Sequence, residues 1–397
     1  MNTPLNNAKL QSDIDFNGYR AINNPSGGAQ GTFVNVKDSP YNATGLGVAD
    51  DTVAIQSAMN DVAAAGGGTV FFPKGIYLCD GVFGPSYNSI LEIPFVGATS
   101  GSAIAITFLG EQPVPWSVGF SYDISRSSTI KTSRTNGTGA NCSLIAASSH
   151  LGDGVIPYTS MNNIMVSIRN INFSIPDNPT MNGVYLGGCG WAFVEHCSIQ
   201  GGGTEPTHGT TGLWMPNETN FGMNYANYVM VAGWDTLMKS GEHLRAPQVQ
   251  LTLGKRGLVF LESIYPSWGN IQLERCVDGI VFLGYHTVDL LVEAERQGGG
   301  WWAPSHDISD ASNYGTGTIR YMIGQGGGGA VTNAAALLGG TGLTLIDLYS
   351  GNISLNTSYG AGRPASKITG KGCVPAGGTT GQSLKKLSNA DYDVGWV

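Results

Sequence analysis

The chain has 397 residues, 59 of them glycine, and only 12% are charged, whereas about a quarter is usual in soluble domains. This composition predicts many tight turns and argues against a helical bundle. The net charge is −8 and the 20 basic residues are scattered, which argues against nucleic acid and anionic membranes as partners.

The sequence gives no sign of a membrane span or a secretory signal. No stretch approaches the roughly 20 apolar residues that a span needs, so we expect no membrane insertion. The first residues, MNTPLNNAKLQSDIDFNGYR, lack a basic region followed by an apolar one. If the protein acts outside the cell, we expect it to leave by lysis or by a dedicated assembly.

The cysteines show neither a CxxC pair nor the spacing of a zinc site. A chain of this length does not need disulfides to hold its core. We therefore expect free thiols that pack as small hydrophobic groups. The six are Cys79, Cys142, Cys189, Cys197, Cys276 and Cys373.

The stretch ADDTVAIQSAMNDVAAAGGGTVFFPKGIYL, from residue 49 to 78, predicts one helix over 51–65 and then two short strands. Asp50 and Asp51 can cap the helix N-terminus. Ile55, Met59 and Val62 recur at helical spacing and form one apolar stripe. Three glycines end the helix, and the strand segments TVFF and IYL follow. A single short helix among strands needs a long β structure for its apolar stripe to cover.

The middle of the chain contains a weak repeat. The segments GVYLGG, GLWMPN, DTLMKS, GLVFLE and GIVFLG begin at residues 183, 212, 235, 257 and 279, and VQLTLGKRG at 249 and IQLERCVDG at 271 keep the same period. A period of 20–30 residues with several strands and no helix indicates a solenoid. The spacing of leucine-rich repeats is missing, so the sequence predicts an all-β parallel β-helix. The helix would then cover its open N-terminal end.

Residues 33–78, FVNVKDSPYNATGLGVADDTVAIQSAMNDVAAAGGGTVFFPKGIYL, carry a specific resemblance. They resemble the opening of proteins of the pectate-lyase-like superfamily, whose pattern is approximately NVKDFGAxGDGxTDDTxAIQxAIxxAxxxGGGTVxFPxGxY. The resemblance implies a right-handed parallel β-helix with an N-terminal capping helix. One departure is GLGVADD, where the family usually has an aspartate between two glycines, so the tight turn there is altered.

Both ends of the chain are similar to segments of phage tail proteins. LQSDIDFNGYRAINNP (10–25) is similar to N-terminal segments of tail fibres and spikes, and VPAGGTTGQSLKKLSNADYDVGWV (374–397) resembles a recurrent tail-fibre segment. The resemblance implies a phage or prophage tailspike, a homotrimer that joins other tail proteins in the virion and acts on a bacterial surface polysaccharide. We expect a tail-attachment segment over 1–32, the β-helix over 33–345 and a C-terminal tail-fibre-like segment over 346–397.

Candidate catalytic residues come from three strands aligned by their inward apolar positions: VQLTL at 249, IQLER at 271 and VEAER at 292. The outward rows are then Gln250/Gln272/Glu293 and Thr252/Glu274/Glu295. Glycosidases use two carboxylates, and outward side chains on adjacent coils stand about 5 Å apart. We predict Glu274 and Glu295 as the catalytic pair, with Glu293 beside them. The alternative is that these charges only solvate the sheet and pair weakly with arginine neighbours.

The following loop, QGGGWWAPSHDISDASNYG (297–315), holds adjacent tryptophans that could stack on sugar rings, although packing between subunits explains them equally well. The same loop also holds His306 and Asp310, close to the tryptophans in the sequence. The predicted substrate-binding residues are Trp301, Trp302, Arg275, Arg296, Asp307, Tyr265 and Trp268.

Weaker candidates remain. Glu262 ends GLVFLE, while His243 and Arg245 in SGEHLRAP could serve a lyase, which needs a base near a cation. We expect Glu195 and His196 in FVEHCSI to be one outward and one inward residue of a strand. Calcium of the pectate-lyase kind calls for clustered aspartates on one coil, which we do not find, so no metal or cofactor is expected.

Together these features predict a tailspike protein that binds and hydrolyses capsule or O-antigen during host recognition. Two alternatives use the same fold. One is a non-catalytic receptor-binding or structural tail protein, and the other is a polysaccharide lyase. New reducing ends would distinguish a hydrolase from the first alternative, and unsaturated products that absorb ultraviolet light would identify the second.

Overall fold

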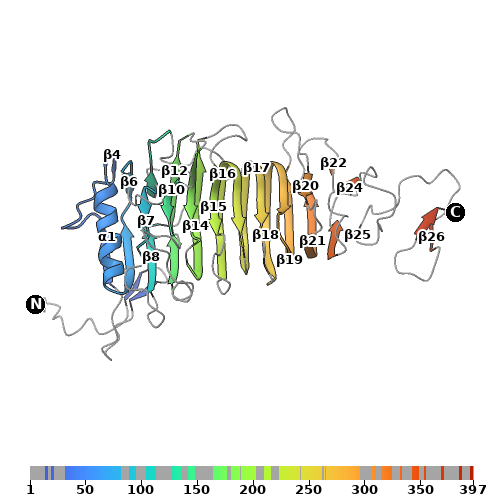
Figure 1. Ribbon diagram of the computed structural model, residues 1–397, viewed down its shortest axis with the longest axis horizontal. Helices are drawn as coiled ribbons and strands as arrows, with labels where there is room; N and C mark the ends of the chain where they lie inside the picture. Colours follow the sequence, from blue (N-terminus) through green and yellow to red (C-terminus); the bar gives the residue numbers. More distant parts are fainter. Residues whose placement is uncertain are drawn as a thin grey trace, which may run out of the picture.

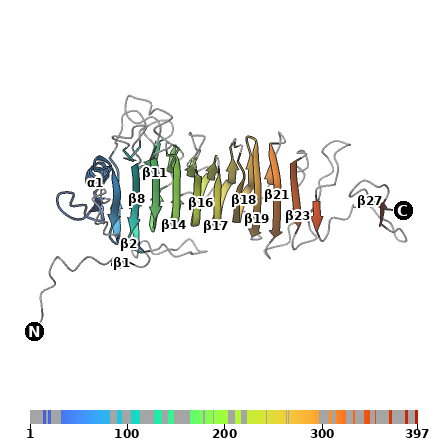
Figure 2. The same ribbon diagram turned by 90° about the horizontal axis from the view of Figure 1, so that it is seen from below.

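The structure is a computed structural model, and it describes residues 14–16, 19–21, 32–81, 89–94, 104–112, 127–135, 142–147, 164–176, 180–187, 189–202, 210–215, 223–241, 243–261, 263, 265–295, 306–309, 314–323, 331–332, 342–347, 353–354, 368–370, 384–386 and 394–396. Strands stacked along one long axis make up most of the molecule, and the helix α1 (Thr52–Ala64) lies at one end (Figures 1 and 2). One sheet of 21 strands winds round this axis, and all its pairings are parallel. The predicted fold is confirmed: the chain is a right-handed parallel β-helix.

This continuous sheet is bent into three flat faces, and each coil contributes a strand segment to them. We call these faces the first, second and third sheets, after their order in the coil. The first sheet contains β3 (Thr32–Asn35), β5 (Gly67–Phe72), β8 (Ile104–Gly110), β11 (Ile164–Arg169), the first parts of β14 (Trp191–Gly201), β16 (Met223–Ser240), β17 (Leu244–Phe260), β18 (Ser267–Phe282) and β19 (His286–Glu295), and then β21 (Gly315–Ile323), β23 (Gly342–Asp347) and β25 (Ile368–Gly370).

The second sheet contains β4 (Leu46–Asp50), β6 (Gly75–Leu78), β9 (Ser128–Lys131), β12 (Ile171–Ile175) and the continuations of β14, β16, β17, β18 and β19. The third contains β7 (Leu91–Glu92), β10 (Cys142–Ala146), β13 (Met181–Tyr185), β15 (Thr211–Met215), the last parts of β16, β17 and β18, and β20 (His306–Ser309).

Three further pairs of short strands lie outside this sheet. They are β1 (Ile14–Phe16) with β2 (Tyr19–Ala21), β22 (Val331–Thr332) with β24 (Ile353–Ser354), and β26 (Leu384–Lys386) with β27 (Val394–Trp396).

The corners of the coil are single residues in the left-handed backbone conformation. Asn170, His196 and Tyr228, with φ of 60°, 51° and 51°, occupy the same corner between the first and second sheets on successive coils. Leu253 and Arg275, with φ of 56° and 52°, occupy the corner between the second and third sheets. Such a residue turns the chain without a loop, so β16, β17 and β18 each run through all three sheets.

The repeat predicted from the sequence matches the coils except at one point. Val184 pairs with Leu213, and Leu258 pairs with Ile280, so the glycines that precede these four residues are level as expected. Leu213, however, pairs with Met238, so the segment that begins at 235 was aligned two residues too early. Met238, and not Thr236 at the second position of that segment, continues the inward column of Val184 and Leu213.

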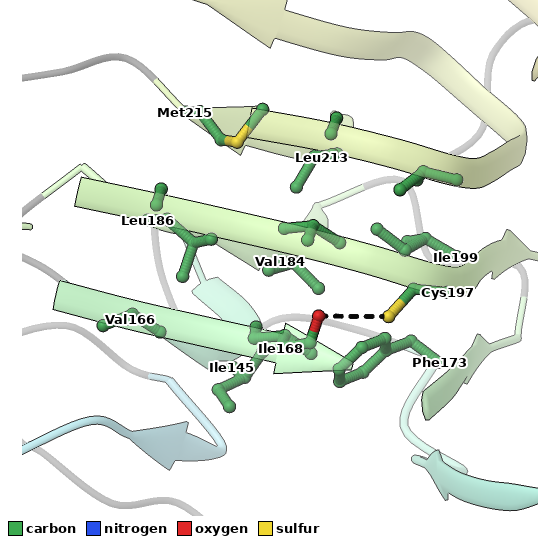
Figure 3. Close-up of a cluster of buried hydrophobic side chains, with 14 of the residues drawn as sticks. Ile145, Val166, Ile168, Phe173, Val184, Leu186, Cys197, Ile199, Leu213 and Met215 are labelled. Carbon is green, nitrogen blue, oxygen red and sulfur yellow. Dashed lines mark hydrogen bonds between the residues drawn. The ribbon is translucent and has the colours of Figure 1, made fainter. Parts of the chain in front are cut away.

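The interior of the solenoid is packed with apolar side chains from all three sheets (Figure 3). The labelled residues there are all buried: Ile145, Val166, Ile168, Phe173, Val184, Leu186, Cys197, Ile199, Leu213 and Met215. The thiol of Cys197 points into this core and donates to the carbonyl oxygen of Ile168, 3.6 Å away. Cys79, Cys142, Cys189 and Cys197 are buried, Cys276 is half-buried and all five are free thiols, as predicted, while Cys373 lies outside the described residues.

Helix α1 covers the N-terminal end of the core, within one residue of the predicted bounds at each end. The helix residues Ile55, Met59 and Val62 are fully buried. Of the two predicted capping residues, Asp50 accepts a hydrogen bond from the amide of Thr52 at 2.9 Å. The predicted cap by Asp51 is wrong, because its carboxylate instead accepts hydrogen bonds from the amides of Thr44 and Gly45, at 2.6 and 3.0 Å. Within the described residues, no helix is long and apolar enough to cross a membrane.

Candidate functional site

The outer face of the first sheet, together with the corner within β16 and the bend before β18, exposes a group of aromatic side chains, which we call the aromatic face. Trp191, Tyr228, Tyr265 and Trp268 are each between 38% and 46% exposed, and Phe193 and Tyr225 are half-buried between them. The six residues are Trp191, Phe193, Tyr225, Tyr228, Tyr265 and Trp268. Because large aromatic groups are rarely left in water without a partner, this face is the strongest candidate for a binding surface.

Strand register aligns part of the aromatic face into one row along the solenoid axis. Phe193, Tyr225, Arg245, Trp268 and Asp289 are level on five successive coils. The ring centroids of Phe193 and Tyr225 are 5.9 Å apart, and the guanidinium carbon of Arg245 lies 5.8 Å from the centroid of Trp268. With a coil spacing of about 4.8 Å, the row is roughly 19 Å long.

A charged cluster lies at the N-terminal end of this row. Nε of Arg169 is 2.8 Å from Oε2 of Glu195, and both side chains are partly exposed. Burial raises the pKa of Tyr225, and the charge of Glu195 raises it further while Arg169 opposes it. The ring of His196 stacks on Tyr228, with centroids 4.9 Å apart.

The expected alternation of Glu195 and His196 about a strand is wrong. Val194 and Cys197 are the buried residues, and the corner residue His196 interrupts the alternation between them. Glu195 therefore faces outward, and the ring of His196 lies against the exposed Tyr228.

The residues considered for a lyase also lie on the aromatic face. The rings of His243 and Tyr265 are stacked, with centroids 4.0 Å apart. Arg245 donates from Nη1 to the carbonyl oxygen of Pro266 at 2.8 Å, next to Trp268. A base and a cation are therefore adjacent to an exposed stacking surface.

The predicted register of the carboxylates on the second sheet is confirmed. Glu274 is level with Thr252 and with Glu295 on the adjacent coils, and Glu293 is level with Gln272. The side chain of Glu274 is only 3% exposed, and Nε of Arg275 lies 3.7 Å from its Oε1. The catalytic roles of Glu274, Glu295 and Glu293 stay predictions.

Other predicted site residues fall outside what the structure describes. Trp301, Trp302, Arg296, Glu262 and Asp310 lie outside the described residues. His306 and Asp307 belong to β20, where the backbone alone is described. Tyr265 and Trp268 are the predicted binding residues that lie on the aromatic face.

A buried Ser–His pair in the same coils is structural. Nε2 of His286 is 2.7 Å from Oγ of Ser267, and its Nδ1 is 2.8 Å from the carbonyl oxygen of Leu261. Both side chains are at most 2% exposed, so no polymer can reach them. Burial lowers the pKa of His286 to about 4, which keeps the ring neutral. In the described part of the chain, no group of three or more His, Cys, Asp or Glu side chains could hold a metal ion.

Comparison with known proteins gives a family and several partial relatives. The sequence profile of the rhamnogalacturonase A/epimerase, pectate lyase-like family matches residues 33–281. The mannuronan C5-epimerases AlgE2 and AlgE1 of Azotobacter vinelandii are 44% identical over 73 residues, which is 18% of this chain and only 7% and 5% of theirs.

Two solved structures are similar over most of the chain at low identity. ORF18 of Geobacillus virus E2 is 13% identical with a TM-score of 0.30, and the match covers 79% of this chain and 60% of that one. The A-module of the A. vinelandii mannuronan C-5 epimerase AlgE6 is 13% identical with a TM-score of 0.26, and the match covers 79% and 97%. Since the family profile spans more than half of the sequence, the chain belongs to the rhamnogalacturonase A/epimerase, pectate lyase-like family.

Proposed function

We propose that this protein binds a bacterial surface polysaccharide along its aromatic face, as a tailspike-type protein of a phage or prophage. The observation that carries the proposal is the row from Phe193 to Asp289, in which each of five successive coils contributes one outward side chain. Membership of a pectate lyase-like family and the tail-like sequences at both ends support it.

The aromatic face suits an extended sugar chain. Aromatic rings present flat apolar surfaces to the C–H faces of sugars, while Arg245 and Asp289 offer polar groups to the hydroxyls. The row follows the solenoid axis, so a polymer laid along it meets a new side chain about every 4.8 Å. A short ligand would fill only part of this surface, which favours a polysaccharide.

The proposal includes hydrolysis by a carboxylate pair outside the aromatic face. Glu195 and Asp289 are the carboxylates described on that face, and they lie roughly four coil spacings apart. This separation is well beyond the distances of about 5–10 Å that glycosidases use. Glu274 and Glu295 remain the proposed catalytic pair, on adjacent coils of the second sheet. The burial of Glu274 means that its carboxylate must become accessible for cleavage.

The test uses purified capsule and O-antigen with the wild-type protein and two variants. Trp268→Ala should weaken binding about 5- to 150-fold, if the loss of this ring costs the 1–3 kcal/mol that is typical of an aromatic side chain stacked on a nucleic-acid base. Phe33→Ala is the matched control, because Phe33 is an exposed aromatic four coils before Phe193. New reducing ends would support hydrolysis, and equal binding by the two variants would contradict the proposal.

A uronate lyase is the second candidate function. It is favoured by His243 and Arg245, which place a base and a cation beside Tyr265 and Trp268. The mannuronan epimerases among the partial relatives support the same class of substrate. Products that absorb ultraviolet light, lost in His243→Asn, would favour the lyase over the hydrolase. Binding without either product would indicate a receptor-binding tail protein.

A further inference from the structure

The row from Phe193 to Asp289, here called the aromatic row, has a second row of outward side chains beside it. Asn227 and Gln248 are level on β16 and β17. Asn270 continues this second row on β18, because it stands directly before the residue that is level with the one after Gln248. We call these three residues the amide row. Each follows a member of the aromatic row by two or three residues, so the two rows are about 7 Å apart.

The amide row faces the same side as the aromatic row and has hydrogen-bonding capacity to spare. One buried residue separates Tyr225 from Asn227 and Trp268 from Asn270, so the members of each pair point to the same side of the sheet. All three amide side chains are half-buried and remain open to solvent. Within the described residues, the side-chain amides of Gln248 and Asn270 make no hydrogen bond. An amide both donates and accepts, as a sugar hydroxyl does.

The charged side chains along the two rows are already engaged. At the N-terminal end, Nε of Arg169 is 2.8 Å from Oε2 of Glu195. At the other end, Nη2 of Arg320 is 2.7 Å from Oδ1 of Asp289. Arg245, between them, donates to a backbone carbonyl oxygen. On the described strands of the first sheet from β11 to β21, every charged side chain therefore has a partner, which favours an uncharged ligand.

We propose that the amide row determines which glycan the aromatic face accepts, by hydrogen bonding the hydroxyl or acetamido groups of an uncharged stretch of sugars. Sugar rings would stack on the aromatic row, and the substituents at one edge of each ring would reach the amides of Gln248 and Asn270. The inference rests on the proposed function and adds two statements to it. The bound stretch is neutral, which sets it apart from the substrate of a uronate lyase, and specificity is set beside the stacking surface.

The test uses an array of purified bacterial capsule and O-antigen polysaccharides, divided into uncharged and acidic members. Wild-type protein should be retained by uncharged members, and added salt should leave this binding unchanged because no net charge is recognised. Gln248→Leu and Asn270→Leu should each weaken binding to the preferred polysaccharide about 2- to 12-fold, as expected for the loss of one neutral hydrogen bond. Both variants should also change the order of preference among the members, whereas Trp268→Ala should weaken binding to all of them alike.

Gln272→Leu is the matched control, because Gln272 is a half-buried amide on the same strand as Asn270 but belongs to the second sheet. It should bind like the wild type, and unchanged melting temperatures would show that all variants are folded. Preference for acidic members, binding that salt abolishes, or amide-row variants that bind like Gln272→Leu would each overturn the inference while the loss in Trp268→Ala still supports the proposed function. Wild-type protein that is retained by no member would overturn both.

Discussion

At the scale of single residues, His286 links stability to pH. Its ring is 2% exposed and fully hydrogen-bonded when neutral, and burial lowers its pKa to about 4, from about 6.5 when free. The unfolded chain therefore binds this proton more readily than the folded one. The stabilisation is complete above about pH 6.5 and is lost as the pH falls towards 4, by about 3 kcal/mol.

The first prediction follows from this linkage. Urea unfolding at pH 7 and at pH 4.5 should show that His286→Asn loses part of the wild-type dependence on pH, although it is less stable at both. His196→Asn is the control, since asparagine tolerates the left-handed corner, and it should keep the wild-type dependence. The same pH dependence in His286→Asn and the wild type would show that His286 does not control the effect.

The second prediction concerns the carboxylate pair. Glu274→Gln and Glu295→Gln should each abolish cleavage of the polysaccharide while binding and melting temperature stay nearly unchanged. Glutamine keeps the shape of the side chain but can act neither as an acid nor as a nucleophile. Normal cleavage by both variants would mean that neither residue is catalytic and that Arg275 and the buried Glu274 form a structural pair.

At the scale of elements, α1 stabilises the N-terminal end of the solenoid through the apolar stripe that it buries. Met59→Asp would place a charge in the fully buried interface of the helix with the first coils, which should cost several kcal/mol and soluble expression. Ser57→Asp, on the exposed side of the same helix, should be nearly neutral. The comparison of melting temperatures checks this third prediction, and equal losses would mean that the burial of the stripe does not matter.

The sequence predicts the strands well where their inward side chains are apolar. The alignment of Val249, Ile271 and Val292 was correct because apolar residues mark the core side of each strand. The corners could not be predicted, since Tyr228 and Arg275 are unusual in the left-handed conformation and carry no glycine signal. Each corner shifts the alternation by one residue, which is why Glu195 and His196 were misplaced.

The candidate site was only partly predictable for a related reason. Tyr265 and Trp268 stand close together in the sequence, whereas Phe193, Tyr225 and Trp268 are brought together by coil stacking. An alignment of the first-sheet strands by their inward apolar residues would place these three side chains in one row. The predicted carboxylate pair depends instead on the register of the second sheet, where the outward residues Thr252 and Glu274 are buried.

At the scale of the whole molecule, the solenoid leaves exposed apolar groups near its N-terminal end. Phe33, Leu46 and Val48 of the first coil and Val53 in the first turn of α1 are between 62% and 83% exposed. Parallel pairing protects the strand edges between coils, but it cannot cover these side chains. Association with sister subunits or with a different protein would remove this surface from water.

The last prediction is that the protein forms a homotrimer, as its resemblance to tailspikes implies. Light scattering at micromolar concentration should give about three times the chain mass of 41.5 kDa. The double variant Leu46→Lys/Val48→Lys separates the two ways of covering the exposed side chains: if sister subunits cover them, its mass should fall towards that of the monomer. If the trimer persists in that variant, these side chains do not hold the subunits together and are left for a different partner protein. A wild-type monomer would instead contradict the trimer, and the proposed binding of glycan to the aromatic face would then have to be a property of the single chain.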